Sequence, residues 1–176
     1  MKKIILTVFA ATSLLLYSTP SFAISLSVGV PIGASIKGDD GSEVADGASG
    51  YFIGVQLPFG LGLGMDSHKT KFKDDSTLKV ATSMYNLYYQ LPVPVVSLIL
   101  GLGTGNSNYD CPGCAEIFDK GAATQWYTSI GFPIIPFFDI HLSYRSITSK
   151  NIKHKESGSK EDVSGTITGI GLAFNF

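Results

Sequence analysis

The chain has 176 residues, of which 44% are hydrophobic, 15% are charged and 20 are glycine. With 13 Lys and Arg against 14 Asp and Glu, its formal net charge is −1, so no excess of basic residues points to nucleic acid as a partner. Past the first residues, no apolar run approaches the ~20 residues that a membrane-spanning helix needs. The composition therefore excludes a helical membrane protein and a nucleic-acid-binding protein.

Residues 1–23 have the three parts of a secretory signal. Lys2 and Lys3 supply positive charge, residues 4–16 are apolar, and Ser21-Phe22-Ala23 places small residues where signal peptidase reads. A membrane-spanning helix would need a longer apolar run, and no cysteine follows Ala23 to carry a lipid. We predict a cleavable signal over residues 1–23, cut near Ala23, and one domain over residues 24–176. Removing two lysines leaves 11 basic and 14 acidic residues, a net charge of −3.

Large apolar residues alternate with small or polar ones in eight later segments, and a period of two is typical of β-strands. In the first segment the apolar face runs from Leu26 to Ala34, and in the last it includes Leu172, Phe174 and Phe176. The predicted strands cover about residues 24–37, 48–57, 61–71, 78–91, 95–106, 122–132, 137–148 and 160–176.

The connections between these strands alternate in length and chemistry. Those after the second, fourth and sixth strands are short, uncharged and contain proline, at residues 57–60, 91–94 and 132–136, and proline suits a tight turn. The others are polar loops at residues 38–47, 72–77, 107–121 and 149–159. Short turns on one side and long loops on the other are typical of barrels that cross the outer membrane.

The two faces of the strands differ in size as well as in polarity. One face carries Leu, Ile, Val and aromatic residues, and the other is rich in Gly, Ser and Ala. A soluble barrel of the lipocalin kind would turn the large apolar face inward around a ligand. Small residues instead suit the narrow interior of eight strands, and large ones suit lipid. We predict an all-β fold, an eight-stranded antiparallel up-and-down transmembrane β-barrel.

The signal, the eight alternating strands, the turns with proline and the terminal Asn175-Phe176 resemble small outer-membrane β-barrel proteins of Gram-negative bacteria, of the kind of the OmpA transmembrane domain, OmpX and the OmpW-like proteins. The resemblance covers residues 24–176 and lies in the pattern rather than in a sharp motif. It implies location in the bacterial outer membrane. It also implies that Phe174 and Phe176 serve as the signal read by the barrel-assembly machinery. Such families include anchors, adhesins, host-interaction proteins and pores, so the function does not transfer.

The seventh predicted strand places four polar residues on the inner face. They are Asp139, His141, Ser143 and Arg145, and Asp66 and His68 face them from the third strand. One interpretation is a polar relay or gate in which His141 titrates near neutral pH. The interpretation we favour is a network that fills the narrow interior, in which Asp139 pairs with Arg145 and Asp66 and His68 join across the lumen.

His141-Leu142-Ser143 also resembles the His-x-Ser pair of lipid A 3-O-deacylases, which are small outer-membrane barrels. That resemblance implies a base and a nucleophile acting on an acyl ester. The sequence departs from the family because Tyr144 stands where the family has Asn, and because the membrane part of the last strand has no Glu: the nearest, Glu156 and Glu161, fall in or near the last loop. The face assignment also turns both residues away from lipid. We therefore predict that the protein is not an enzyme.

Cys111-Pro112-Gly113-Cys114 is the only cysteine pair. Because a secreted protein meets an oxidising compartment, we favour a local disulfide between Cys111 and Cys114. A redox pair or half of a metal site are the alternatives. No thioredoxin-like unit surrounds the pair, and a zinc site would need a dimer or His154 to complete it. We predict no metal and no cofactor.

The predicted loops carry opposite charges. The first loop is acidic, while lysines flank the second and fill the fourth; the acidic residues are Asp39, Asp40, Glu43 and Asp46, and the basic ones are Lys69, Lys71, Lys73, Lys79, Lys150, Lys153, His154, Lys155 and Lys160. Such charges suit either contact with lipopolysaccharide or another surface polyanion or a simply solvated surface. We predict a structural or surface-interaction role through the loops. A narrow pore for small or apolar solutes is the alternative, and an acyl-ester hydrolase a lesser one.

Overall fold

The computed structural model describes residues 24–38, 41–73, 77–93, 95–135 and 137–176. The predicted signal, residues 1–23, lies outside the described residues. No helix in the described part of the chain is long and apolar enough to cross a membrane.

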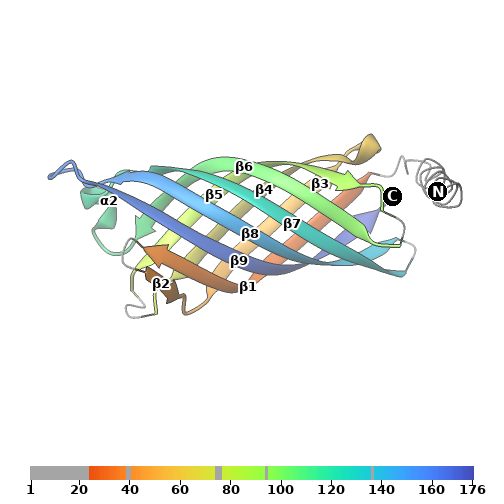
Figure 1. The fold of residues 1–176 in the computed structure, drawn as a ribbon, viewed down its shortest axis with the longest axis horizontal. Coiled ribbons are helices and arrows are strands. Elements are labelled where there is room, and N and C mark those ends of the chain that lie inside the picture. The colour runs from red at the N-terminus through yellow and green to blue at the C-terminus, as the bar shows by residue number, and fades with distance from the viewer. Residues whose placement is uncertain (1–23, 39–40, 74–76, 94, 136) are drawn as a thin grey trace, which may run out of the picture.

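Eight antiparallel strands close into a barrel, which confirms the predicted fold (Figure 1). Each strand pairs with its neighbours in the chain, and the last strand pairs back to the first. The strands of the barrel are β1 (Ser25–Gly38), β3 (Ala48–Gln56), β4 (Leu61–Lys71), β5 (Lys79–Leu91), β6 (Ser97–Asp110), β7 (Gly121–Ile135), β8 (Phe138–Lys153) and β9 (Lys160–Asn175).

The two ends of the barrel differ. The turn end carries the short connections, among them the 3-10 turn η1 (Pro58–Gly60), and the C-terminus. The loop end carries a short strand, β2 (Gly41–Val44), which pairs only with β1, and a one-turn helix, α2 (Cys114–Ile117). Figure 1 shows β2 and α2 at the end of the barrel opposite to the C-terminus.

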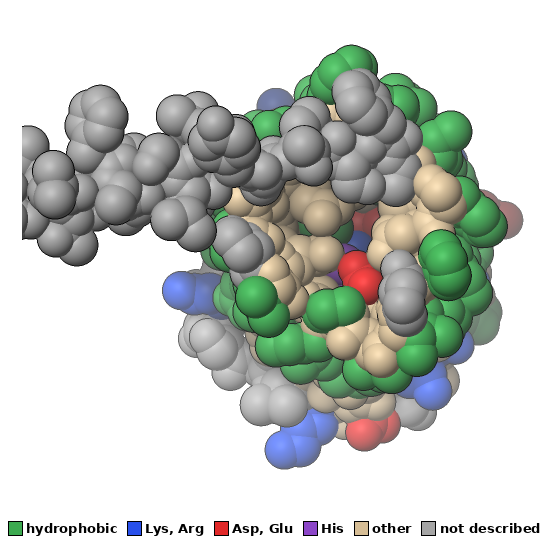
Figure 2. Space-filling model, turned by 90° about the vertical axis from the view of Figure 1, so that its right-hand side faces the viewer, with side chains coloured by type: hydrophobic (Ala, Val, Ile, Leu, Met, Phe, Trp, Pro, Cys, Tyr) green, Lys and Arg blue, Asp and Glu red, His purple; other side chains and the backbone are tan. Residues whose placement is uncertain are grey.

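The predicted faces are confirmed along most of the wall. Outward side chains such as Leu102 (70% exposed), Tyr85 (69%) and Leu63 (58%) are large and apolar, whereas inward Asp66 (2%) and Arg145 (6%) are buried. Figure 2, which looks into the turn end, shows apolar side chains around the outside and polar and charged ones in the hollow. A continuous apolar band of this kind is unsuited to water and matches the outer face of a membrane barrel.

The prediction that Ala34 faces outward is wrong. Pro31 pairs with Gly169 and Gly33 pairs with Thr168, which leaves Ile32 as the extra residue of a β-bulge. A bulge exchanges the two faces of the strand beyond it. Ala34 and Ile36 therefore turn inward, and Ile36 is only 4% exposed.

The predicted loops at 107–121 and 149–159 are too long. β6 continues to Asp110 and β8 continues to Lys153, so the connections shorten to residues 111–120 and 154–159. These strands continue past the segment in which apolar residues alternate, because hydrogen bonding between strand backbones does not require apolar side chains. The added residues are mostly polar on both faces, so the sequence pattern resembles that of a loop.

An apolar cluster closes the interior at the loop end. We call it the loop-end cluster: Ile36, Ala45, Val80, Ile152 and Val163. Asn151 has a left-handed backbone (φ 59°) within a bulge of β8 and turns the fully buried Ile152 into the mouth of the barrel. Asparagine adopts this backbone conformation more readily than most residues.

Candidate functional site

A charged layer crosses the middle of the barrel interior. Arg145 of β8 donates from Nε to Asp66 Oδ2 of β4 at 3.0 Å. Gln125 of β7 donates from Nε2 to the same oxygen at 2.7 Å and also to the side-chain oxygen of Asn86 on β5. We call these four residues the central layer. It joins four strands of the wall and gives the buried charges hydrogen-bonded partners, which burial requires.

The guanidinium group of Arg145 also lies between two aromatic rings. Its Cζ atom is 3.7 Å from the centroid of the Phe52 ring and 4.8 Å from that of Tyr127. Planar guanidinium stacks on aromatic faces while it donates in its own plane. Arg145 is therefore held by two rings as well as by its carboxylate.

The expected pairing of Asp139 with Arg145 is wrong. The two residues lie six positions apart on one strand, which separates their Cα atoms by about 20 Å. Asp139 instead accepts a hydrogen bond from Ser97 at 3.1 Å and lies 3.8 Å from His141 Nε2. Asp139 and His141 thus form a second polar group nearer the turn end.

His68 joins neither group by a hydrogen bond. It is 3% exposed, its ring meets the Phe52 ring edge-on at 6.3 Å between centroids, and its Nδ1 has no partner among the described residues. It lines a cavity of about 30 Å³, and His141 lines another of about 60 Å³. Each cavity is large enough to hold water. His68 and His141 therefore lie beside separate small cavities of the described interior.

His141 and Ser143 do not form a base–nucleophile pair. Ser143 Oγ accepts from Arg145 Nη1 at 2.5 Å and donates to the Gly169 carbonyl at 3.4 Å. His141 Nδ1 lies 3.3 Å from Ser129 Oγ. An activated serine needs its base within hydrogen-bond reach. Because Ser143 bonds Arg145 and Gly169, and His141 contacts Ser129 instead, His141 is not placed to activate Ser143. Both residues lie on the inward face of β8, as predicted.

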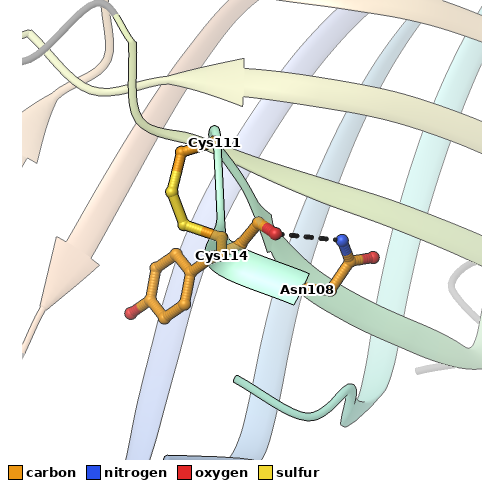
Figure 3. The surroundings of a disulfide bond; sticks show 4 residues. Asn108, Cys111 and Cys114 are labelled. Atoms are coloured by element: carbon orange, nitrogen blue, oxygen red, sulfur yellow. Dashed lines mark hydrogen bonds between the residues drawn. A yellow bond between two sulfur atoms is a disulfide. The ribbon is translucent and has the colours of Figure 1, made fainter. Parts of the chain in front are cut away.

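The disulfide lies at the loop end beside α2 (Figure 3). Cys111 and Cys114 are joined across a tight turn, with their Cα atoms 5.2 Å apart, and Gly113 takes the left-handed conformation (φ 82°) that the turn requires. Just before the turn, the Asn108 side chain donates to the backbone carbonyl of Tyr109 at 3.1 Å. This bond fixes the end of β6, from which the turn departs.

His154, the residue that a metal site at the cysteines would need, packs against aromatic rings instead. Its ring packs edge-on against Phe118 at 5.2 Å, and Phe118 packs against Tyr109 at 4.9 Å. In the described part of the chain, no three His, Cys, Asp or Glu side chains cluster in a way that could hold a metal ion. This aromatic stack bridges the two long connections at the loop end.

Lysines face one another across the strands at the loop end. Lys71 is the direct partner of Lys79, and Lys153 is the direct partner of Lys160. Like charges placed directly opposite each other destabilise a sheet. Lys69 is different, since its ammonium lies 2.7 Å from Asp110. This contact, beyond the apolar band, holds the pKa of Asp110 below its ordinary value.

The two aromatic residues of the expected assembly signal lie at the turn end of the last strand. The Phe174 ring packs edge-on against Phe138 with 4.6 Å between centroids, while Phe176 is 79% exposed and donates its backbone N–H to Ile24. The Phe176 side chain is thus accessible at the turn end.

Sequence reasoning missed several residues of the central layer and its surroundings. Gln125, Asn86 and Tyr127 fall on the inward face of the predicted strands, but nothing in their local pattern singles them out. Phe52 was also missed, because it lies within an otherwise apolar run of β3. The signal that could have found the first two is simply their inward-facing position on strands of the same barrel as Asp66 and Arg145.

No family model matches the chain, and no curated protein matches it. Solved structures do. The crystal structure of Neisserial surface protein A aligns with 89% of this chain and 97% of its own, at 14% identity and a TM-score of 0.66. The solution structure of the E. coli outer membrane protein W aligns with 88% of this chain and 98% of its own, at 9% identity and a TM-score of 0.55. At such identities the likeness concerns the fold, and the chain has the fold of small outer-membrane eight-stranded barrels.

Proposed function

We propose that this chain, after removal of residues 1–23, is a bacterial outer-membrane protein that acts through its loop end, as a structural or surface-interaction protein rather than an enzyme. The apolar band around the wall supports the location, because exposed apolar patches of this extent do not persist in water. Phe174 and Phe176 would present the signal for the barrel-assembly machinery at the turn end.

The filled interior argues for a surface role over a narrow pore. The central layer closes the barrel at mid-height, and the loop-end cluster closes it again at the mouth. Two closures in series leave cavities of about 60 and 30 Å³. Cavities of this size favour a partner that meets the chemistry of the loops over a solute that crosses the barrel.

A pair of lysines placed directly opposite each other at the loop end favours an anionic partner. Lys153 and Lys160 are exposed and directly opposite each other. Their mutual repulsion is relieved when an anion lies between them. A polyanionic saccharide surface, such as lipopolysaccharide phosphates or another surface polyanion, fits this chemistry.

The test is binding of the refolded barrel to dextran sulfate, with neutral dextran as the reference. We expect salt-sensitive binding to dextran sulfate only, because interactions of exposed charges are screened beyond about 10 Å at 0.1 M salt. The double variant K153Q/K160Q should bind at least about fivefold more weakly.

A charge-matched variant separates the lysine pair from overall charge. K37Q/K120Q removes the same two charges from positions that are not opposed, and it should bind nearly as the unaltered chain does. Equal losses in both variants, or binding that ignores salt, would reject the lysine pair as the site.

A further inference from the structure

The barrel wall has an open seam between β1 and β3. The two strands pair from Ser25 and Gln56 only as far as Gly29 and Phe52. Beyond that point β1 next gains a partner on this side at Ser35, which pairs with Val44 of β2. Residues 30–34 of β1 and 48–51 of β3 therefore face each other without strand pairing. The β1–β3 pairing bounds this unpaired stretch toward the turn end, and the β1–β2 pairing bounds it toward the loop end. We call the unpaired stretch the window.

Distortions in both strands hold the window open. Ile32 is the bulged residue of β1, next to Pro31, which has no N–H to donate. On β3, Gly50 has a φ of 145°, and a Cβ there would collide with the backbone of Ser67 and His68. β3 thus lies tightly against β4 while β1 stays with β9. Both bulges and such glycines re-aim strands at defined places.

An apolar groove lies on the outside of the barrel at the turn-end edge of this window, where Val30 and Tyr51 belong to both. It has a volume of about 500 Å³, and its outward-facing rim residues are apolar, among them Val30 (50% exposed), Tyr51 (43%) and Ile170 (39%). Its floor is formed by Gly29, Gly171 and Phe52, which also line the interior cavity. At this place the wall is one residue thick and carries two glycines without side chains.

We propose that the groove binds one acyl chain of an anionic, ester-linked lipid of the surrounding membrane, an inference that rests on the proposed membrane location. The apolar rim contacts the methylene chain. In hydrocarbon an unpaired backbone N–H or C=O is unfavourable by several kcal/mol. The ester group of the lipid can accept a hydrogen bond from an unpaired N–H at residues 30–34, which a free hydrocarbon cannot do.

The charge above the window selects an anionic headgroup. Lys37 is exposed, and it follows the inward-facing Ile36, so it points outward at the loop end of β1. It lies three residues beyond the last unpaired position, about 10 Å along the strand. A lipid whose chain lies in the groove therefore brings its phosphate towards Lys37.

The test measures quenching of a tryptophan in the groove by brominated lipids in vesicles. Trp126 is the only tryptophan, so W126F gives a silent background. Y51W places the reporter in the groove, and Y85W places the matched reporter on β5, which is paired on both sides at this position. The full barrel is reconstituted in phosphatidylcholine vesicles that contain dibrominated phosphatidylglycerol or dibrominated phosphatidylcholine.

We expect the Y51W reporter to prefer the brominated phosphatidylglycerol over the brominated phosphatidylcholine by about fivefold, the advantage one lysine gives an anionic lipid. The Y85W reporter should show no preference. Adding V30F fills the groove and K37Q removes the charge, so each should abolish the preference of the Y51W reporter while the Y85W reporter stays unchanged. A mobility shift between boiled and unboiled samples verifies that each variant is folded.

The outcomes separate this site from the membrane location. If both lipids quench the Y51W and Y85W reporters equally, the groove takes ordinary surrounding lipid and the proposed site is refuted, while the membrane location stands. If brominated lipid quenches neither reporter in a folded barrel, the chain is not in the bilayer and both proposals fall. A preference that survives V30F also refutes the site.

Discussion

At the scale of single residues, the central layer depends on the buried ion pair between Asp66 and Arg145. Asp66 accepts from both Arg145 and Gln125, and both charged side chains are almost fully buried. Removing one charge leaves the other unpaired in a low-dielectric interior. Breaking a buried pair in this way is more damaging than replacing both partners.

We therefore predict that Asp66→Asn lowers the free energy of unfolding by about 3 kcal/mol. Urea unfolding of the refolded barrel in detergent micelles measures the change. The double variant D66N/R145Q should be more stable than the sum of the two single changes predicts, because it leaves no lone charge. Strict additivity would mean that the two side chains do not interact in the folded barrel.

The same layer marks the limit of what the sequence reveals about individual residues. Alternation placed Asp66, His68, Asp139, His141 and Arg145 inside, and all five are buried. Which side chains these residues bond could not be predicted from the alternation, because it depends on how strands that are distant in the sequence align in the barrel. Arg145 and Asp66 lie 79 positions apart in the chain, and no local pattern reports the register between β4 and β8.

At the scale of elements, glycines on one strand make room for aromatic rings on the next. Gly62 of β4 is the direct partner of Tyr88 on β5, and Gly101 of β6 is the direct partner of Tyr127 on β7. A Cβ at either glycine would collide with the facing tyrosine ring. The glycine-rich inner face is thus filled by neighbouring aromatic residues, the same arrangement that covers glycines in designed sheets.

Gly62→Ala should therefore lower the free energy of unfolding by about 2 kcal/mol, since overpacking forces the buried Tyr88 ring from its place. Gly64→Ala is the matched control on the same strand and face. Its new Cβ would lie 3.1 Å from the Ile53 carbonyl and 3.6 Å from Asn86 Cβ, so its effect should stay below about 1 kcal/mol. Urea unfolding compares the two; equal losses would mean that the ring is free to move.

The elements also show why some strands could be predicted and others could not. The apolar alternation inside the wall is imposed by lipid on one side and a narrow interior on the other, and it predicted all eight strands of the barrel. Beyond the part of the wall that faces lipid, the alternation no longer marks the strands. β2 and the extensions to Asp110 and Lys153 are mostly polar, and the bulge at Ile32 depends on how β1 meets β9.

At the scale of the whole molecule, the interior is a series of layers from the turn end to the loop end. The Asp139 group comes first, followed by the central layer. A row of hydroxyls then joins Thr82, Ser107 and Ser149 at 2.7–2.8 Å, and the loop-end cluster closes the mouth. Polar layers alone could admit water, but an apolar layer at the mouth excludes it. The barrel is therefore closed by two kinds of chemistry in series.

This arrangement predicts that the unaltered barrel shows no discrete channel events in a planar bilayer. D66A/R145A removes the central layer but keeps the loop-end cluster, and V80A/I152A thins the cluster but keeps the central layer. For closures in series, each double variant should remain silent, and only the combination of all four changes should conduct. A gel-mobility shift on boiling verifies that each variant still forms a closed barrel, which distinguishes a silent channel from an unfolded chain. Channel events in the unaltered protein would instead favour the narrow pore, and events in D66A/R145A alone would show that the loop-end cluster does not seal the mouth.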